Sequence, residues 1–208
     1  MTNPVMPLRW PKGPFPERYR FGAVEARLAT AWHADDEVKL APLLTSLALV
    51  PPHDPWVRVY TASERHEEAW HDALRARATE LGATAFRWIA PARERRDATE
   101  PSADVIGIVP TTDVVDAVSA VGVAGPSHGI GMPAIVRFLV TLRSFGRYEI
   151  EAMGEDAIVL RYTPKSDEAL TRVADRVLHL CPPLARSSTA EAIASSIRAR
   201  GRLEMDWA

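Results

Sequence analysis

The densest run of side chains able to perform acid–base or metal chemistry is the segment HEEAWHD, residues 66–72. Two histidines that bind one zinc ion from a single helix are spaced four residues apart, so that both rings lie on one face. His66 and His71 are five apart, which places them about 140° apart around a helix. We therefore expect no metal ion and no catalytic residue here, and we interpret the segment as the solvated face of a helix.

A glycine-rich loop with the sequence GPSHGIG spans Gly125–Gly131. A phosphate-binding loop of the Walker type requires a lysine before the next helix, and the dinucleotide-binding type requires a preceding strand. This loop contains no lysine, and a helix is expected to precede it. His128 lies close to the start of the next helix and is the best candidate for binding a small anion. The alternative is that the glycines only connect two helices.

Carboxylates gather around a predicted β-hairpin whose turn is Gly154-Glu155-Asp156. Glu149 and Glu151 precede the turn and are two residues apart, so in a regular strand both point to the same face of the sheet. They could bind a cation or a basic partner there. They could equally form the solvated face of an antiparallel sheet.

Cys181 is the only cysteine, so no intrachain disulfide can form. His179 is two residues away on the same predicted helix, and side chains at that spacing face different directions. The apolar residues around Cys181 favour a small buried side chain over a nucleophile. A single thiol fits a reducing compartment, and the first residues carry no apolar core of a secretory signal, so we expect a cytoplasmic protein.

The first 22 residues form an arm that is rich in proline and aromatic side chains. Five prolines lie within residues 1–20, and at that density they favour an extended chain over a helix or a central strand. Trp10, Phe15 and Tyr19 lie between them, and a purely solvated tail would carry fewer aromatic residues. We expect the arm either to pack across the protein's own surface or to dock on a partner through these side chains.

The 208 residues have the composition of an ordinary folded protein, with 47% hydrophobic and 25% charged residues. The formal net charge is −2 and the basic residues are scattered, which argues against binding a nucleic acid or an anionic membrane. No apolar stretch approaches the roughly 20 residues that cross a bilayer.

Residues 23–92 are expected to contain two helices followed by a strand–helix–strand unit. The helices are predicted at 23–33 and 36–49, and the strands at 56–61 and 83–89 with a helix over 63–81 between them. This length matches a βαβ unit, and ligands of open α/β sheets bind at the carboxyl ends of strands, here near Thr61–Glu64. A charged loop with the sequence PARERRDATEPSAD then leads into the second half.

Residues 104–208 are predicted to follow the order strand, helices, strand, strand, helices, strand. The strands are expected at 104–109, 148–153, 157–162 and 202–207, and the expected helix caps are Thr112 or Asp113, Ser166 and Thr189. This βαββαβ order is typical of a split-βαβ sheet, mainly antiparallel, with helices on one face. The predicted fold class is therefore mixed α/β (α+β), and the two halves could be separate domains or form one compact unit.

The stretch from about Gly129 to Trp207 resembles the bacterial domain-of-unknown-function family numbered 4253. The resemblance rests on a helix that ends in an aromatic residue (IVRFLVTLRSFGRYEI), on a strand pair (IEAMGEDAIVLRYTP), on a helix ending in Cys-Pro (ALTRVADRVLHLCPP) and on a terminal strand with Asp-Trp (GRLEMDWA). The positions that match the family's motifs, which we interpret as structural, are Cys181, Pro182, Asp206 and Trp207.

The chain departs from the family pattern at polar positions. Pro183 stands where the family has an Asp after Cys-Pro, and Met205-Asp206-Trp207 stands where the family has Trp-Trp-Asp. The resemblance therefore implies an architecture rather than an activity.

Two functions from different classes remain open. The first is a non-catalytic protein-interaction module, which would be an adaptor, accessory or immunity-type bacterial protein that binds another protein and needs no cofactor. The alternative is a small-molecule-binding protein or an enzyme that uses the mouth of the βαβ unit or the Gly125–Gly131 loop. The aromatic arm and the scattered acid–base residues favour the first.

Overall fold

The computed structural model describes residues 34–45, 47–50, 56–62, 64–90 and 104–207. These residues form one open sheet of seven strands in the order β1-β2-β4-β3-β5-β6-β7, so the predicted mixed α/β class is confirmed. The strands are β1 Leu47–Val50, β2 Arg58–Ala62, β3 Thr84–Ile89, β4 Val105–Val109, β5 Gly146–Gly154, β6 Ala157–Pro164 and β7 Arg202–Asp206. The helices are α1 Ala34–Leu44, α2 Glu68–Glu80, α3 Val114–Val121, η3 Pro126–His128, α4 Met132–Phe145, α5 Asp167–Leu180, α6 Pro182–Ser187 and α7 Ala190–Arg200.

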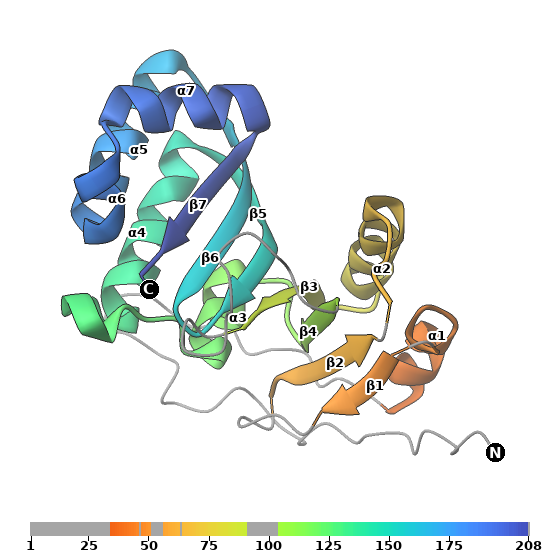
Figure 1. Cartoon of the computed structure of the whole chain (residues 1–208). Helices are drawn as coiled ribbons and strands as arrows, with labels where there is room; N and C mark the ends of the chain where they lie inside the picture. The colour runs from red at the N-terminus through yellow and green to blue at the C-terminus, as the bar shows by residue number, and fades with distance from the viewer. Residues whose placement is uncertain (1–33, 46, 51–55, 63, 91–103, 208) are drawn as a thin grey trace.

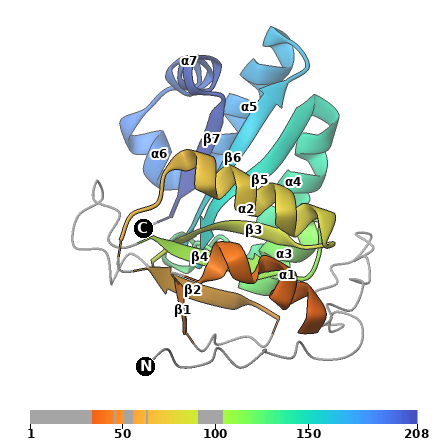
Figure 2. The same cartoon turned by 90° about the vertical axis from the view of Figure 1, so that its right-hand side faces the viewer.

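Helices cover both faces of this sheet, and each face has its own apolar cluster. On one face α1 and α2 pack against β1, β2, β4 and β3, with Leu40, Leu74 and Ile106 among the buried residues (Figure 2). On the other face α3, α4, α5 and α7 enclose the larger cluster, which contains Leu139 and Trp207. The second half carries its helices on one face, as predicted (Figure 1).

The predicted βαβ unit is present, but its two strands are not neighbours. The strand β4 lies between β2 and β3 and is antiparallel to both. Its residues Ile106, Ile108 and Val109 are buried, and an added Cβ on Gly107 would lie 2.4 Å from the Phe86 ring. A strand that is buried on both faces belongs in the interior of a sheet, which explains why β4 takes this place.

The order of elements in the second half and the hairpin of β5 with β6 are as predicted, but the split-βαβ order of the strands is wrong. A split βαβ arrangement would place β4 between β6 and β7, whereas β5, β6 and β7 pair in sequence and β4 pairs with the first half. The two halves are joined by the parallel pair β3–β5, which extends from Arg87↔Ala152 to Ile89↔Gly154. One sheet therefore runs through both halves.

Local capping chemistry sets most helix starts in the second half. Asp113, Ser166 and Thr189 each accept a backbone N–H from the first turn of the helix that follows, which confirms these predicted caps. The predicted helix 36–49 is wrong in its last part, because α1 ends at Leu44 and β1 follows at once. Short apolar runs such as LALV fit a strand or a helix equally well by pattern alone.

Two of the predicted boundaries lie largely outside the described residues, namely the arm of residues 1–22 and the loop of residues 91–103. The division into domains therefore stays a prediction. Within the described residues, no helix combines the length and the hydropathy needed to cross a membrane.

Candidate functional site

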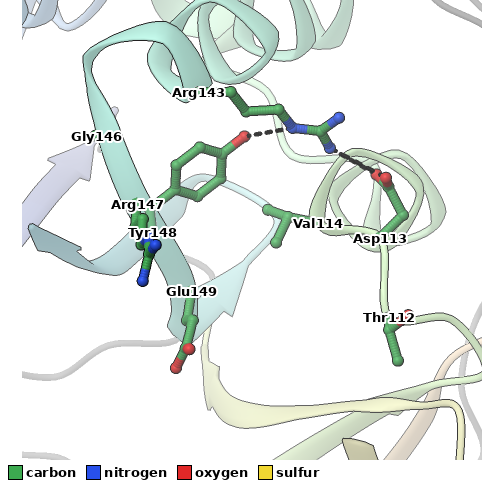
Figure 3. Close-up of a pocket in the computed structure, with 8 residues that line it drawn as sticks. All are labelled: Thr112, Asp113, Val114, Arg143, Gly146, Arg147, Tyr148 and Glu149. Atoms are coloured by element: carbon green, nitrogen blue, oxygen red, sulfur yellow. Dashed lines mark hydrogen bonds and ion pairs between the residues drawn. The ribbon is translucent and has the colours of Figure 1, made fainter.

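A surface pocket of about 390 Å³ lies where the start of α3, the end of α4 and the start of β5 meet (Figure 3). Its size falls within the range of small ligand or side-chain pockets. The lining residues are Thr112, Asp113, Val114, Arg143, Gly146, Arg147, Tyr148 and Glu149. Of the residues singled out from the sequence as binding candidates, Glu149 is the one that lies here.

Asp113 connects the helix cap to the pocket wall. Its Oδ1 accepts the backbone N–H of Val115 at 2.8 Å, and its two carboxylate oxygens lie 3.0 and 3.1 Å from Nη2 of Arg143. The hydroxyl of Thr111 accepts the N–H of Asp113 at 3.0 Å. The bonds to Val115 and Arg143 fix the carboxylate, so Asp113 is both the cap of α3 and the counterion of Arg143.

Tyr148 lines the pocket from the strand β5. Its hydroxyl donates to the carbonyl of Leu139 at 2.6 Å and accepts from Nε of Arg143 at 3.3 Å. Burial raises the pKa of Tyr148 despite the nearby guanidinium, so the phenol stays protonated. Burial acts to lower the pKa of Arg143, but the bonds to Tyr148 and Asp113 outweigh it and raise that pKa. Hydrogen bonds and an ion pair therefore hold these three side chains together.

Arg147 and Glu149 lie at the rim and differ from these three side chains in their lack of partners rather than in exposure, because Arg143 is exposed as well. Both are exposed, and neither side chain forms an ion pair or hydrogen bond with another described residue. They flank Tyr148 along β5 and share the sheet face opposite to it. The rim thus presents one free positive and one free negative charge.

Glu151 does not lie on a solvated face, and the expectation that it contacts a partner is wrong for this structure. The register of β5 and β6 shifts between Ile150 and Ala152, so Glu151 is the extra residue of a β-bulge. Only 2% of its surface is exposed. Its carboxylate lies 2.7 Å from Nη2 of Arg87 and 2.7 and 2.8 Å from two nitrogens of Arg202.

The arginines around Glu151 continue into an ion-pair network that joins the two halves. Nη2 of Arg161 lies 2.7 Å from Oε1 of Glu68, and Nη1 lies 2.9 Å from Oδ1 of Asp72. Burial acts to raise the pKa of Glu68, but Arg87 and the other arginines outweigh it and lower that pKa. The network links α2 to the strands β3, β5, β6 and β7, so we interpret it as structural.

His71 is buried, with 3% of its surface exposed, so the interpretation of residues 66–72 as a solvated face is wrong at this position. It shares the inner face of α2 with Leu74 and Ala78. Its Nε2 lies 3.5 Å from Oδ2 of Asp104 and forms no hydrogen bond with a described residue. His66 stacks on Trp70 with ring centroids 4.1 Å apart.

The burial of His71 predicts a pH dependence of stability. Desolvation lowers its pKa below 6.5, although Asp104 opposes this effect, and Arg87 and Arg75 lower it further while Glu68 raises it. The unfolded chain therefore takes up a proton first as the pH falls below about 6.5, and the free energy of unfolding decreases by up to about 1.4 kcal/mol per pH unit. We expect His71→Gln to remove this slope, measured as the difference between wild type and variant in urea unfolding from pH 7.5 to 5.5. Equal slopes in both proteins would contradict the assignment.

The loop Gly125–Gly131 packs on the end of the chain. Gly125 pairs with Ile130 in an isolated bridge, and an added Cβ on Gly125 would lie 2.5 Å from the Trp207 ring. His128 is half-buried at the end of η3, and its backbone N–H donates to the carbonyl of Gly125 at 2.9 Å, whereas its imidazole has no polar partner among the described residues. Close packing on Trp207 accounts for the glycine at position 125.

The residues of the proposed family motifs, Cys181, Pro182, Asp206 and Trp207, lie close together where the last strand meets the end of α5. The thiol of Cys181 donates to the carbonyl of Asp206 at 3.0 Å, and the indole N–H of Trp207 donates to the carbonyl of Leu180 at 2.8 Å. Pro182 begins α6 directly after Cys181. Cys181 is fully buried, as predicted, and burial raises the pKa of its thiol. These contacts attach the last strand to α5 and α6.

The remaining binding candidates, Trp10, Phe15 and Tyr19, lie outside the described residues. Within the described ranges, no cluster of three or more His, Cys, Asp or Glu side chains has the geometry of a metal site. Sequence reasoning missed Arg143 and Tyr148 as pocket residues. Arg143 lies in the last turn of α4, and Tyr148 lies in β5 just after the helix ends. This closeness in sequence could have indicated that the two side chains meet.

Comparison of the chain with protein-family models, with curated proteins and with solved structures finds no match.

Proposed function

We propose that this chain is a non-catalytic protein-interaction module, of the adaptor, accessory or immunity type, and that the pocket between α3, α4 and β5 belongs to its contact surface. The partner would be another protein rather than a nucleic acid or a membrane, in keeping with the net charge of −2. A cytoplasmic location and the kinship with the family numbered 4253 are parts of the same proposal.

The observation that carries the proposal is that some polar side chains of the pocket are paired with one another, whereas the charged side chains at its rim are not. Asp113, Arg143 and Tyr148 bind one another and form one wall of the pocket. Arg147 and Glu149 at the rim are exposed and have no side-chain partner among the described residues. A wall of paired side chains with unpaired charges of both signs at the rim favours recognition of a partner by complementary charge.

The test is purification of the tagged full-length chain from its host cell, followed by mass spectrometry of what stays bound. The proposal expects one protein at a constant molar ratio, with less recovered as the salt concentration rises, because rim charges are screened. Recovery of a small molecule at a constant ratio, with no protein at such a ratio, would contradict the proposal.

The His71–Asp104 pair favours a second candidate function, a ligand-binding protein or enzyme at the mouth of the βαβ unit. Asp104 lies next to the end of β2, where the backbone N–H of Ala62 donates to its carbonyl oxygen at 2.9 Å. This is the place near Thr61–Glu64 where a ligand was expected. Both side chains are more than 90% buried, so a ligand would need to displace part of the surrounding chain. Loss of small-molecule binding in His71→Gln, with protein binding intact, would favour this candidate.

A further inference from the structure

The pocket lies at the place in the sheet where the parallel strands β3 and β5 are no longer paired. Within the described residues, β5 pairs with β3 only from Ala152 to Gly154, although β5 begins at Gly146. The first residues of β5 therefore have β6 on one side and the pocket on the other. An unpaired strand edge presents backbone donors and acceptors that can pair with another chain.

The register shows which backbone groups face the pocket. The N–H of Tyr162 donates to the carbonyl of Gly201, so the amide groups of Tyr162 point away from β5. In an antiparallel pair the residue opposite, Tyr148, must then also direct its N–H and C=O away from β6. Neither group forms a hydrogen bond with another described residue. One free donor and one free acceptor thus face the pocket, at the spacing of a strand.

The side chains around this amide define what would fit beside it. Tyr148 points toward the helices, where Val114 is the one apolar side chain among the helix residues that line the pocket, so an apolar residue paired with Tyr148 could pack against Val114 and the Tyr148 ring. Arg147 and Glu149 point to the opposite face and are free. Cross-strand neighbours on one face stabilise a pair when their charges are opposite.

We propose that this edge of β5 binds an extended segment of a partner protein, which adds a short antiparallel strand beside Tyr148. This inference rests on the proposed function and specifies its site. The segment reads basic–apolar–acidic from its N-terminus, because an antiparallel chain passes Glu149 first, then Tyr148, then Arg147. Two hydrogen bonds to Tyr148 provide affinity, and the two charges fix direction and register.

The test is an NMR titration of the isotope-labelled full-length chain with the blocked peptide Val-Lys-Val-Asp-Val. We expect the amide signal of Tyr148 to shift. Methylation of the central amide nitrogen of the peptide, or reversal of its two charges to Val-Asp-Val-Lys-Val, should each weaken binding at least tenfold. The double variant Arg147→Glu/Glu149→Arg should prefer the reversed peptide, and the variant Glu168→Arg/Arg172→Glu, an exposed swap on α5, should behave as wild type.

The proposal is overturned if the peptide leaves the Tyr148 amide unshifted at millimolar concentration, or if the methylated peptide binds as well as the parent. The proposed function is judged separately by the recovery of a stoichiometric protein partner. If such a partner is recovered and the Tyr148 amide does not respond, only the strand addition is wrong.

Discussion

Replacing Trp207 by Ala is expected to lower the free energy of unfolding by about 3–5 kcal/mol. The indole is 1% exposed and fills the space between the loop at Gly125 and the end of α5. Its removal leaves a cavity, and it also leaves the carbonyl of Leu180 without its donor. Urea unfolding followed by circular dichroism, with an unchanged slope against denaturant, measures the loss.

Trp207→Phe serves as the matched control, because it keeps most of the apolar volume and removes the indole N–H together with a small part of the ring. The expected loss is then about 1–3 kcal/mol, the cost of an unsatisfied buried acceptor. A loss below about 1 kcal/mol for Trp207→Ala would contradict the interpretation of this residue as the attachment of the last strand.

Replacing Glu151 by Gln is expected to cost about 2–3 kcal/mol, because it leaves Arg87, Arg161 and Arg202 close together without their shared carboxylate. Removal of one partner from a fully buried pair costs more, but these side chains are 29% to 38% exposed and water screens part of the repulsion. The difference between wild type and variant should shrink as the salt concentration rises.

Glu149→Gln on the same strand is the matched control, since Glu149 is exposed and has no ion pair among the described residues. It should change the free energy of unfolding by less than about 0.5 kcal/mol. An equally small change in the free energy of unfolding for Glu151→Gln would contradict the structural role of the ion-pair network.

Features that depend on a few neighbouring residues could be predicted from the sequence. Asp113, Ser166 and Thr189 cap helices through bonds to the next two or three residues, and the hairpin turn at Gly154 follows from local chemistry. The burial of His71 could also have been predicted, because His71, Leu74 and Ala78 repeat at helical spacing on one face.

Features that depend on distant residues could not be predicted. Glu151 is buried because a bulge turns it toward Arg87 and Arg202, which are 64 and 51 residues away. Asp113 meets Arg143 across 30 residues. The position of β4 between β2 and β3 could not be predicted either, because the pattern of apolar and polar residues within a strand does not determine which strands become its neighbours. Such contacts follow from the tertiary fold rather than from local propensity.

The central claim is that the rim of the pocket recognises another protein. The most direct measurement compares the affinity of the purified partner for the wild-type chain, for Arg147→Glu/Glu149→Arg and for the control swap Glu168→Arg/Arg172→Glu, at one fixed salt concentration. Both variants keep the net charge of −2. We predict a loss of at least tenfold in the first variant and none in the second. Equal affinity for all three chains would contradict the claim and would place the contact elsewhere on the molecule.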